Sequence, residues 1–407
     1  MQRPDKPNKA RRAFVKAGVT AVSAMLAPAE QKPQRITSVR AVPLALLPAR
    51  RFGTSKFTSD FDPARFRWFG PFSQLTGSIL VQIRTDQGLT GYGLGGGGGA
   101  AAFIIENHLK DLLLGANALN VELLWDQIFS STSFYGRKGV AIMALSGIDL
   151  ALWDIAAKAA GAPVWQLLGG LAKEKVQAYF TGTDLDLGLK LGFAAFKLPV
   201  NLGPADGQDG KRKVVEMLTR ARKTVGPNAL IMIDCLCRWD VPYTLEMAER
   251  LADVRLYFIE EPLLPDDLAG YELLCREVRG TKIASGEHEF SHYGFRDLLH
   301  HRAAHVLQPD LTWSGGLTTG RRVAALAASS VVPLIPHRGG SLYAIHLILA
   351  SPACPLAESF GTGEPGNELM ALLTAPFSNG FYTAPSGTSF GAEFTEAVLK
   401  KHAPGLM

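Results

Sequence analysis

The chain is poor in charged side chains. Only 19% of its 407 residues are Asp, Glu, Lys or Arg, whereas 47% are hydrophobic, which excludes a disordered chain or a long coiled coil. The net charge is small, +5, and the basic residues form no stripe interleaved with aromatic ones. We therefore expect a substantial core and no nucleic-acid partner.

Cysteine is also scarce, with four in the whole chain. Cys235 and Cys237 stand within an apolar run, and Cys275 and Cys354 are isolated. This spacing is neither a disulfide framework nor a complete zinc-ligand set. We expect buried free thiols.

The N-terminus resembles an export signal. Arg11 and Arg12 precede a weakly apolar stretch at 17–25, and Ala-Pro-Ala follows at 27–29, as in a Tat-type signal with a cleavage site. The stretch is too short to span a membrane. We therefore expect a signal or disordered tail at 1–30 and a periplasmic protein. The alternative is a cytoplasmic protein whose basic tail carries a chance arginine pair.

Residues 31–170 have a mixed pattern that predicts an α+β capping domain. The expected strands are 36–47, 78–84 and 89–94, and the expected helices are near 101–114, 121–131 and 139–160. A glycine run at 95–99 lacks the lysine and hydroxyl residue of a phosphate-binding loop, so we interpret it as a turn before a helix.

From residue 171 to 360, short apolar strands alternate with helical stretches. The expected strands are 176–180, 195–198, 230–233, 256–259, 282–284, 305–307, 332–335 and 356–360. Eight such units predict a parallel sheet closed into a barrel. Residues 361–407 show no further strand of this type, and we expect them to pack on the capping domain.

Most of these strands end in a polar residue, and in a barrel such ends meet at one rim. Asp234, Glu260 and Glu287 end three successive strands. Three carboxylates, with no cysteine expected nearby, suit a hard cation, so we predict one Mg²⁺ per subunit. The other rim residues are Lys197, Asp310, His337 and Glu358.

These motifs resemble the mandelate racemase subgroup of the enolase superfamily. The matching segments, within residues 35–370, are 147–154, 233–234, 258–262, 285–287, 308–310 and 336–337. Segments 193–210, 286–288 and 313–319 are most similar to L-rhamnonate dehydratase-like acid-sugar dehydratases. The resemblance implies a modified (β/α)7β TIM barrel with an N-terminal α+β cap, a homo-oligomer, and Glu260 rather than Glu261 as the metal ligand.

The resemblance also implies a reaction on a small carboxylate substrate. His337, with Asp310 on its other ring nitrogen, is the expected base for the C2 proton of an aldonate. The metal and Lys197 would stabilise the enediolate. Loss of the 3-hydroxyl would then give a 2-keto-3-deoxy sugar acid. Glu358 is expected either to hydrogen-bond the substrate carboxylate or to have a structural role.

The sequence departs from the subgroup around the base and the substrate. Pro199 stands where many members carry a lysine base, and Arg338 follows His337 where the dehydratases have glycine. Histidines expected in the cap loop are missing from 48–75. We predict His288, Arg67 and Arg338 as substrate contacts. The alternatives are a racemase or epimerase of a 2-hydroxy acid, and a non-catalytic exported carboxylate-binding protein.

Overall fold

The computed structural model describes residues 32–44, 77–360 and 368–407. Gln34–Met407 form one compact unit. The expected export signal at 1–30 and Arg67, one of the predicted substrate contacts, lie outside the described residues.

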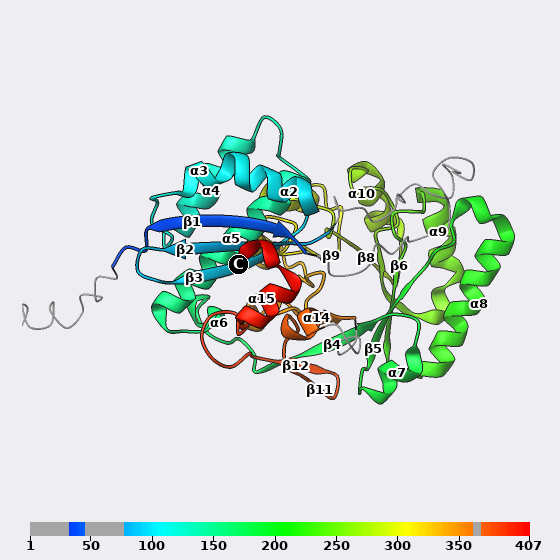
Figure 1. The fold of residues 1–407 in the computed structure, drawn as a ribbon. Helices are drawn as coiled ribbons and strands as arrows, with labels where there is room; N and C mark the ends of the chain where they lie inside the picture. Colours follow the sequence, from blue (N-terminus) through cyan, green and yellow to red (C-terminus); the bar gives the residue numbers. More distant parts are fainter. Residues whose placement is uncertain (1–31, 45–76, 361–367) are drawn as a thin grey trace, which may run out of the picture. The chain divides into compact units, whose positions relative to one another are not determined.

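An antiparallel three-stranded sheet begins the described chain (Figure 1). Its strands are β1 (Ile36–Pro43), β2 (Ile79–Thr85) and β3 (Thr90–Gly95), paired in this order. The second and third strands agree with the predicted positions to within one residue; the first, predicted at 36–47, ends at Pro43, and residues 45–47 lie outside the described residues. The glycine run ends β3 and leads into a helix, as expected of a turn.

The long helix α5 (Val140–Ala160) packs closely on β3. Their backbones approach so closely that a Cβ atom on Gly93 would lie 2.0 Å from the carbonyl oxygen of Gly147. Only glycine fits at this contact. The helix is long and apolar enough to cross a membrane, but 83% of its apolar window is buried inside the protein, as in the core helix of a globular fold. The other helices of this part are α2 (Gly98–Ile104), the π-helix η1 (Ile105–Leu109), α3 (Lys110–Leu113) and α4 (Val121–Thr132).

A barrel of parallel strands follows. Its strands are β4 (Lys175–Thr181), β5 (Ala195–Pro199), β6 (Leu230–Asp234), β7 (Leu256–Glu260), β8 (Lys282–Ser285), β9 (Val306–Leu307) and β10 (Leu356–Ser359). Strands β4 to β9 pair in chain order, and β10 pairs in parallel with β4. The strand predicted at 332–335 contributes a single bridge, Leu307 to Leu334. The predicted TIM-barrel class is confirmed.

The barrel interior is an apolar layer with one residue from each of the eight strand positions. These are Tyr179, Ala195, Met232, Phe258, Ala284, Val306, Ile335 and Leu356. They form a cluster separate from the larger core. The barrel is therefore a packed core, and its chemistry belongs at the strand ends.

Helices lie between most of the barrel strands (Figure 1). They are α7 (Leu185–Lys190), α8 (Gly207–Val225), α9 (Val241–Arg250), α10 (Leu268–Glu277), α11 (Ser291–His300), α12 (Gly316–Ser329) and α13 (Leu342–Ala350). Helix α12 also packs on α5, which ties the barrel to the first part of the fold.

The C-terminal segment contacts both parts of the fold. The Arg40 guanidinium donates to the Gly405 carbonyl at 3.0 Å, and the Tyr92 and Phe394 ring centroids are 4.8 Å apart. Two short strands, β11 (Phe377–Ser378) and β12 (Phe381–Thr383), were not predicted. Strand β12 pairs antiparallel with β4. Strands of two or three residues are too short to show a period in the sequence.

Candidate active site

Three carboxylates meet at the C-terminal ends of neighbouring barrel strands. Asp234 ends β6 and Glu260 ends β7, and the sheet register places them opposite each other. Glu287 follows β8. One carboxylate oxygen from each of the three lies within 4.8 Å of the others. The structure thus brings together the three predicted metal ligands.

The burial and mutual repulsion of these three carboxylates favour the binding of a cation. Burial raises the pKa of Asp234, of Glu260 and of Glu287 to about 7 in each case, and neighbouring carboxylates add to the rise. A divalent cation would offset both effects. The donors are all oxygens on strand ends, which fits Mg²⁺.

Lys197 is buried beside the same carboxylates. Its Nζ lies 2.5 Å from Glu260 Oε1 and 2.7 Å from Glu358 Oε1. Although burial disfavours the charged amine, these two carboxylates raise the pKa of Lys197 well above its usual value. Lys197 therefore provides a fixed positive charge and no free base.

Glu358 is held almost entirely by protein groups. Its Oε1 accepts from the Thr181 hydroxyl at 2.6 Å as well as from Lys197, and its Oε2 accepts from the Arg338 backbone N–H at 2.8 Å. Burial opposes ionisation, but Lys197 and His337 lower the pKa of Glu358 to about 2. These contacts fit the structural alternative, and the role of Glu358 stays a prediction.

His337 and Asp310 form the expected pair. His337 Nδ1 lies 2.8 Å from Asp310 Oδ2, and both side chains are buried. The other ring nitrogen, Nε2, faces the carboxylates, 3.8 Å from oxygens of both Glu287 and Glu358. Burial lowers the pKa of His337, but Glu287, Glu358 and Asp310 together raise it to about 9.

The Trp313 ring lies among the polar groups at the C-terminal rim of the barrel. Its centroid is 5.4 Å from that of His337 and 5.8 Å from that of His288. The Arg338 guanidinium carbon lies 4.9 Å from the same ring. Two predicted substrate contacts, His288 and Arg338, thus lie around the same ring as His337. The roles of individual residues stay predictions.

Two residues of the site were quoted in the sequence only as parts of a motif. The buried Gln308 side chain donates to Glu260 Oε2 at 2.6 Å. Trp313 was not expected at the mouth. Gln308 follows β9 directly, so the rule that strand ends carry polar site residues could have identified it.

Glu261, which was not expected to be a metal ligand, lies outside the set of three carboxylates. Its Oε2 is 2.8 Å from His288 Nδ1 and 3.3 Å from Cys237 Sγ. The position of Cys237 beside Glu261 corrects the expectation that no cysteine lies near these carboxylates. All four cysteines are free, and Cys275 is only partly buried.

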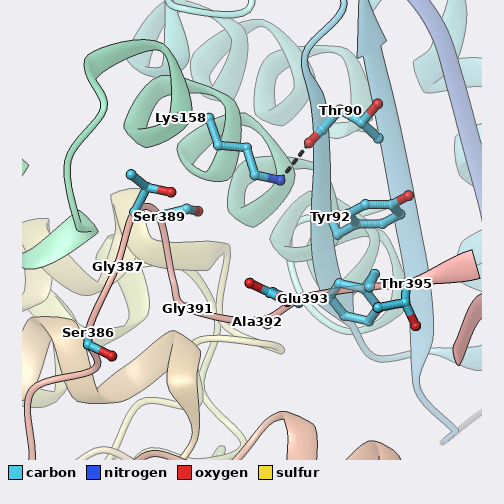
Figure 2. A pocket seen from close by; sticks show the side chains of 12 residues that line it. Thr90, Tyr92, Lys158, Ser386, Gly387, Ser389, Gly391, Ala392, Glu393 and Thr395 are labelled. Carbon is cyan, nitrogen blue, oxygen red and sulfur yellow. Dashed lines mark hydrogen bonds between the residues drawn. The ribbon is translucent and has the colours of Figure 1, made fainter.

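A cavity of about 410 Å³ lies away from this site, between β3, α5 and the C-terminal segment (Figure 2). It shares no residue with the strand-end cluster. The Lys158 amine beside it donates to the Thr90 carbonyl and to Asp154, both at 2.7 Å. Protein groups therefore already pair this charge.

Comparison with known families identifies two matching models. Residues 73–169 match the N-terminal domain of mandelate racemase and muconate lactonizing enzyme, and residues 186–398 match the enolase C-terminal domain-like family. A protein of Caldivirga maquilingensis, named provisionally as an L-rhamnonate dehydratase, is 42% identical over 282 residues, covering 69% of this chain and 71% of that protein.

The chain is also similar, over most of its length, to solved structures of other proteins. The rhamnonate dehydratase of Gibberella zeae complexed with Mg is 33% identical with a TM-score of 0.79, covering 91% of this chain and 96% of that one. A racemase of Streptomyces coelicolor with bound magnesium is 28% identical with a TM-score of 0.75, covering 90% and 99%. Bound magnesium in both relatives agrees with the cofactor predicted here.

Proposed function

Because the chain belongs to the enolase superfamily, with the two domains of its mandelate racemase and muconate lactonizing enzyme branch, we propose that it is a Mg²⁺-dependent dehydratase of a sugar acid. The observation that carries this proposal is the asymmetry of the site. His337, oriented by Asp310, stands on one side of the three carboxylates, and Lys197 is held in two ion pairs beside them. Dehydration can proceed with this one base, whereas racemisation normally needs a second acid or base across the substrate.

His337 is proposed to remove the C2 proton of the substrate. Asp310 accepts a hydrogen bond from Nδ1–H, which leaves the lone pair on Nε2; this atom faces the carboxylate cluster, where the substrate would be held. The C2–H bond breaks and its proton moves to Nε2. The protonated His337 then gives a proton to the departing 3-hydroxyl, which leaves as water.

The charge that develops on the substrate carboxylate needs fixed positive groups nearby. Mg²⁺, held by Asp234, Glu260 and Glu287, would supply most of this charge stabilisation. Lys197 contributes a second positive charge that cannot move away, because Glu260 and Glu358 hold it.

The identity of the sugar acid is part of the proposal. L-Rhamnonate is the first substrate to test, because the Caldivirga maquilingensis relative and a Gibberella zeae structure are named for it. His288 and Arg338, beside Trp313, are the described residues placed to contact the sugar chain. We also propose that the protein is a homo-oligomer and that a Tat-type signal directs its export to the periplasm.

The test is a panel of aldonates, including L-rhamnonate, incubated with the Mg²⁺-loaded protein and assayed for 2-keto acid. We expect product with at least one member, and a loss of about 10²–10⁴-fold in turnover for His337→Asn with magnesium affinity retained. His300→Asn, at the end of α11, is the matched control and should keep full turnover.

Other outcomes would identify the alternatives. Deuterium exchange at C2 without keto acid would mean a racemase or epimerase. Magnesium binding with neither exchange nor product across the panel would mean a carboxylate-binding protein. Full turnover in His337→Asn would show that another group is the base.

A further inference from the structure

A second cluster of metal-ligating side chains lies beside the three carboxylates. It consists of Cys237, Glu261 and His288, and one donor atom from each lies within 4.8 Å of the others. These residues come from the loops after β6, β7 and β8, the same loops that carry the proposed magnesium ligands. Two of them, Glu261 and His288, directly follow a magnesium ligand in the sequence.

Cys237 and His288 both contact the same oxygen atom of Glu261. Cys237 Sγ is 3.3 Å and His288 Nδ1 is 2.8 Å from Glu261 Oε2. The other oxygen, Oε1, is buried and has no hydrogen-bond partner within the described part of the chain. A buried carboxylate oxygen without a partner is costly. The cluster therefore has unused binding capacity on a charged group.

The backbone holds this cluster in an unusual conformation. Cys237 and Glu261 have φ values of 56° and 38°, in the left-handed region that non-glycine residues rarely adopt. The Cys237 backbone N–H donates to the Glu261 carbonyl at 2.7 Å. The two loops are thus tied together where the thiol and the carboxylate meet.

We propose that Cys237, Glu261 and His288 form a second cation site, for a thiophilic divalent ion such as Zn²⁺. Thiolate, imidazole and carboxylate are the donors that zinc accepts, and three protein ligands leave a fourth position open. Mg²⁺ takes oxygen donors and would not compete for a thiolate. The two neighbouring sites thus differ in donor chemistry.

The distances are close to those that such an ion requires. Tetrahedral zinc ligands lie about 3.3–3.5 Å apart, given the usual bond lengths. The Cys237–Glu261 separation already matches this spacing. The shorter His288–Glu261 contact would open by about 0.5 Å once the ion replaces the shared proton. The thiol proton would be released to solvent.

This ion would lie next to the magnesium ligands. His288 Nδ1 is 3.7 Å from Glu287 Oε1, so Glu287 borders both sites. An ion held here would also fix His288, which otherwise faces the mouth beside Trp313. The inference rests on the donor atoms and does not depend on the proposed dehydration.

Cobalt is the probe that separates the two sites. The full chain, saturated with Mg²⁺, is titrated with Co²⁺ and followed by near-ultraviolet and visible absorption. We expect a thiolate-to-cobalt charge-transfer band, with one cobalt bound per chain. Cys237→Ser should lose the band, whereas Cys275→Ser, which changes a partly buried thiol elsewhere, should keep it.

His288→Asn provides a second test that leaves the thiol in place. It should weaken cobalt binding by more than about 100-fold, since even indirect supports of a metal contribute 10–100-fold. Folding of each variant is checked by circular dichroism. Only weak, oxygen-type cobalt absorption, the same in wild type and in Cys237→Ser, would overturn the proposal. A charge-transfer band that persists in Cys237→Ser, or an unchanged cobalt affinity in His288→Asn, would also overturn it.

Discussion

Asp310→Asn should inactivate the enzyme by reversing the tautomer of His337. Asp310 Oδ1 accepts from both the backbone N–H and the hydroxyl of Thr312, each at 2.6 Å. In the variant, the asparagine carbonyl oxygen keeps these two bonds. Its amide nitrogen must then take the place of Oδ2, facing His337 Nδ1. Since that nitrogen donates, Nδ1 must accept, and the ring proton moves to Nε2.

The expected loss follows from the role of that proton. A histidine protonated on Nε2 cannot remove the C2 proton, so turnover should fall by about 10²–10⁴-fold, the usual contribution of a general base. This corresponds to about 3–5 kcal/mol in the activation free energy. Removing the Asp310 charge should also lower the pKa of His337 by about 1 to 3. The residual activity should therefore show its acidic limb at lower pH.

The assay compares kcat and its pH profile for wild type, Asp310→Asn and Asp310→Ala on the substrate found in the panel. Alanine removes the orienting group but imposes no tautomer, so Asp310→Ala should retain more activity than Asp310→Asn. Magnesium affinity should be nearly unchanged in both. Equal activity in wild type and Asp310→Asn, or an acidic limb that does not move, would refute the assignment of His337 as the base.

Three further predictions concern the metal, the buried lysine and the cap. Because burial raises the pKa of Asp234, Glu260 and Glu287 to about 7, above their unfolded values, the metal-free protein should lose stability as pH rises from about 4 to 7. Calorimetry should show tighter Mg²⁺ binding and a larger gain in Tm at pH 8 than at pH 6; an affinity independent of pH would contradict this. Lys197→Met removes the lysine ion-pair partner of Glu260 and Glu358 and should lower the free energy of unfolding of the metal-free protein, measured in urea, by about 3–5 kcal/mol. The exposed Lys213→Met should change it little; equal effects would rule out a buried charge network. Gly93→Ala should cost at least about 1–3 kcal/mol because its Cβ meets the Gly147 backbone, while Gly99→Ala, which meets nothing within 4 Å, should not destabilise; similar unfolding curves for the two would show that the close contact is unimportant.

Much of the site could be predicted because, in a parallel barrel, the order of the strands in the sequence determines which strand ends are neighbours at the rim. A polar residue at a strand end must reach the same rim as its counterparts on neighbouring strands. Asp234, Glu260 and Glu287 therefore come together once the strands are identified. The pairing of Asp310 with His337 follows from the same rule, since their strands are neighbours.

The contacts that set protonation and donor chemistry came only from the tertiary structure. Both Lys197 and Glu358 are strand-end residues in the sequence, but only the closed barrel, in which β10 pairs with β4, places their charges 2.7 Å apart. In the same way, Cys237 reaches Glu261 because two loops with positive φ turn toward each other. The order of residues along the strands determined which groups reach the rim. Which of them touch, and hence which carry charge, depended on ångström-scale distances that no sequence period encodes.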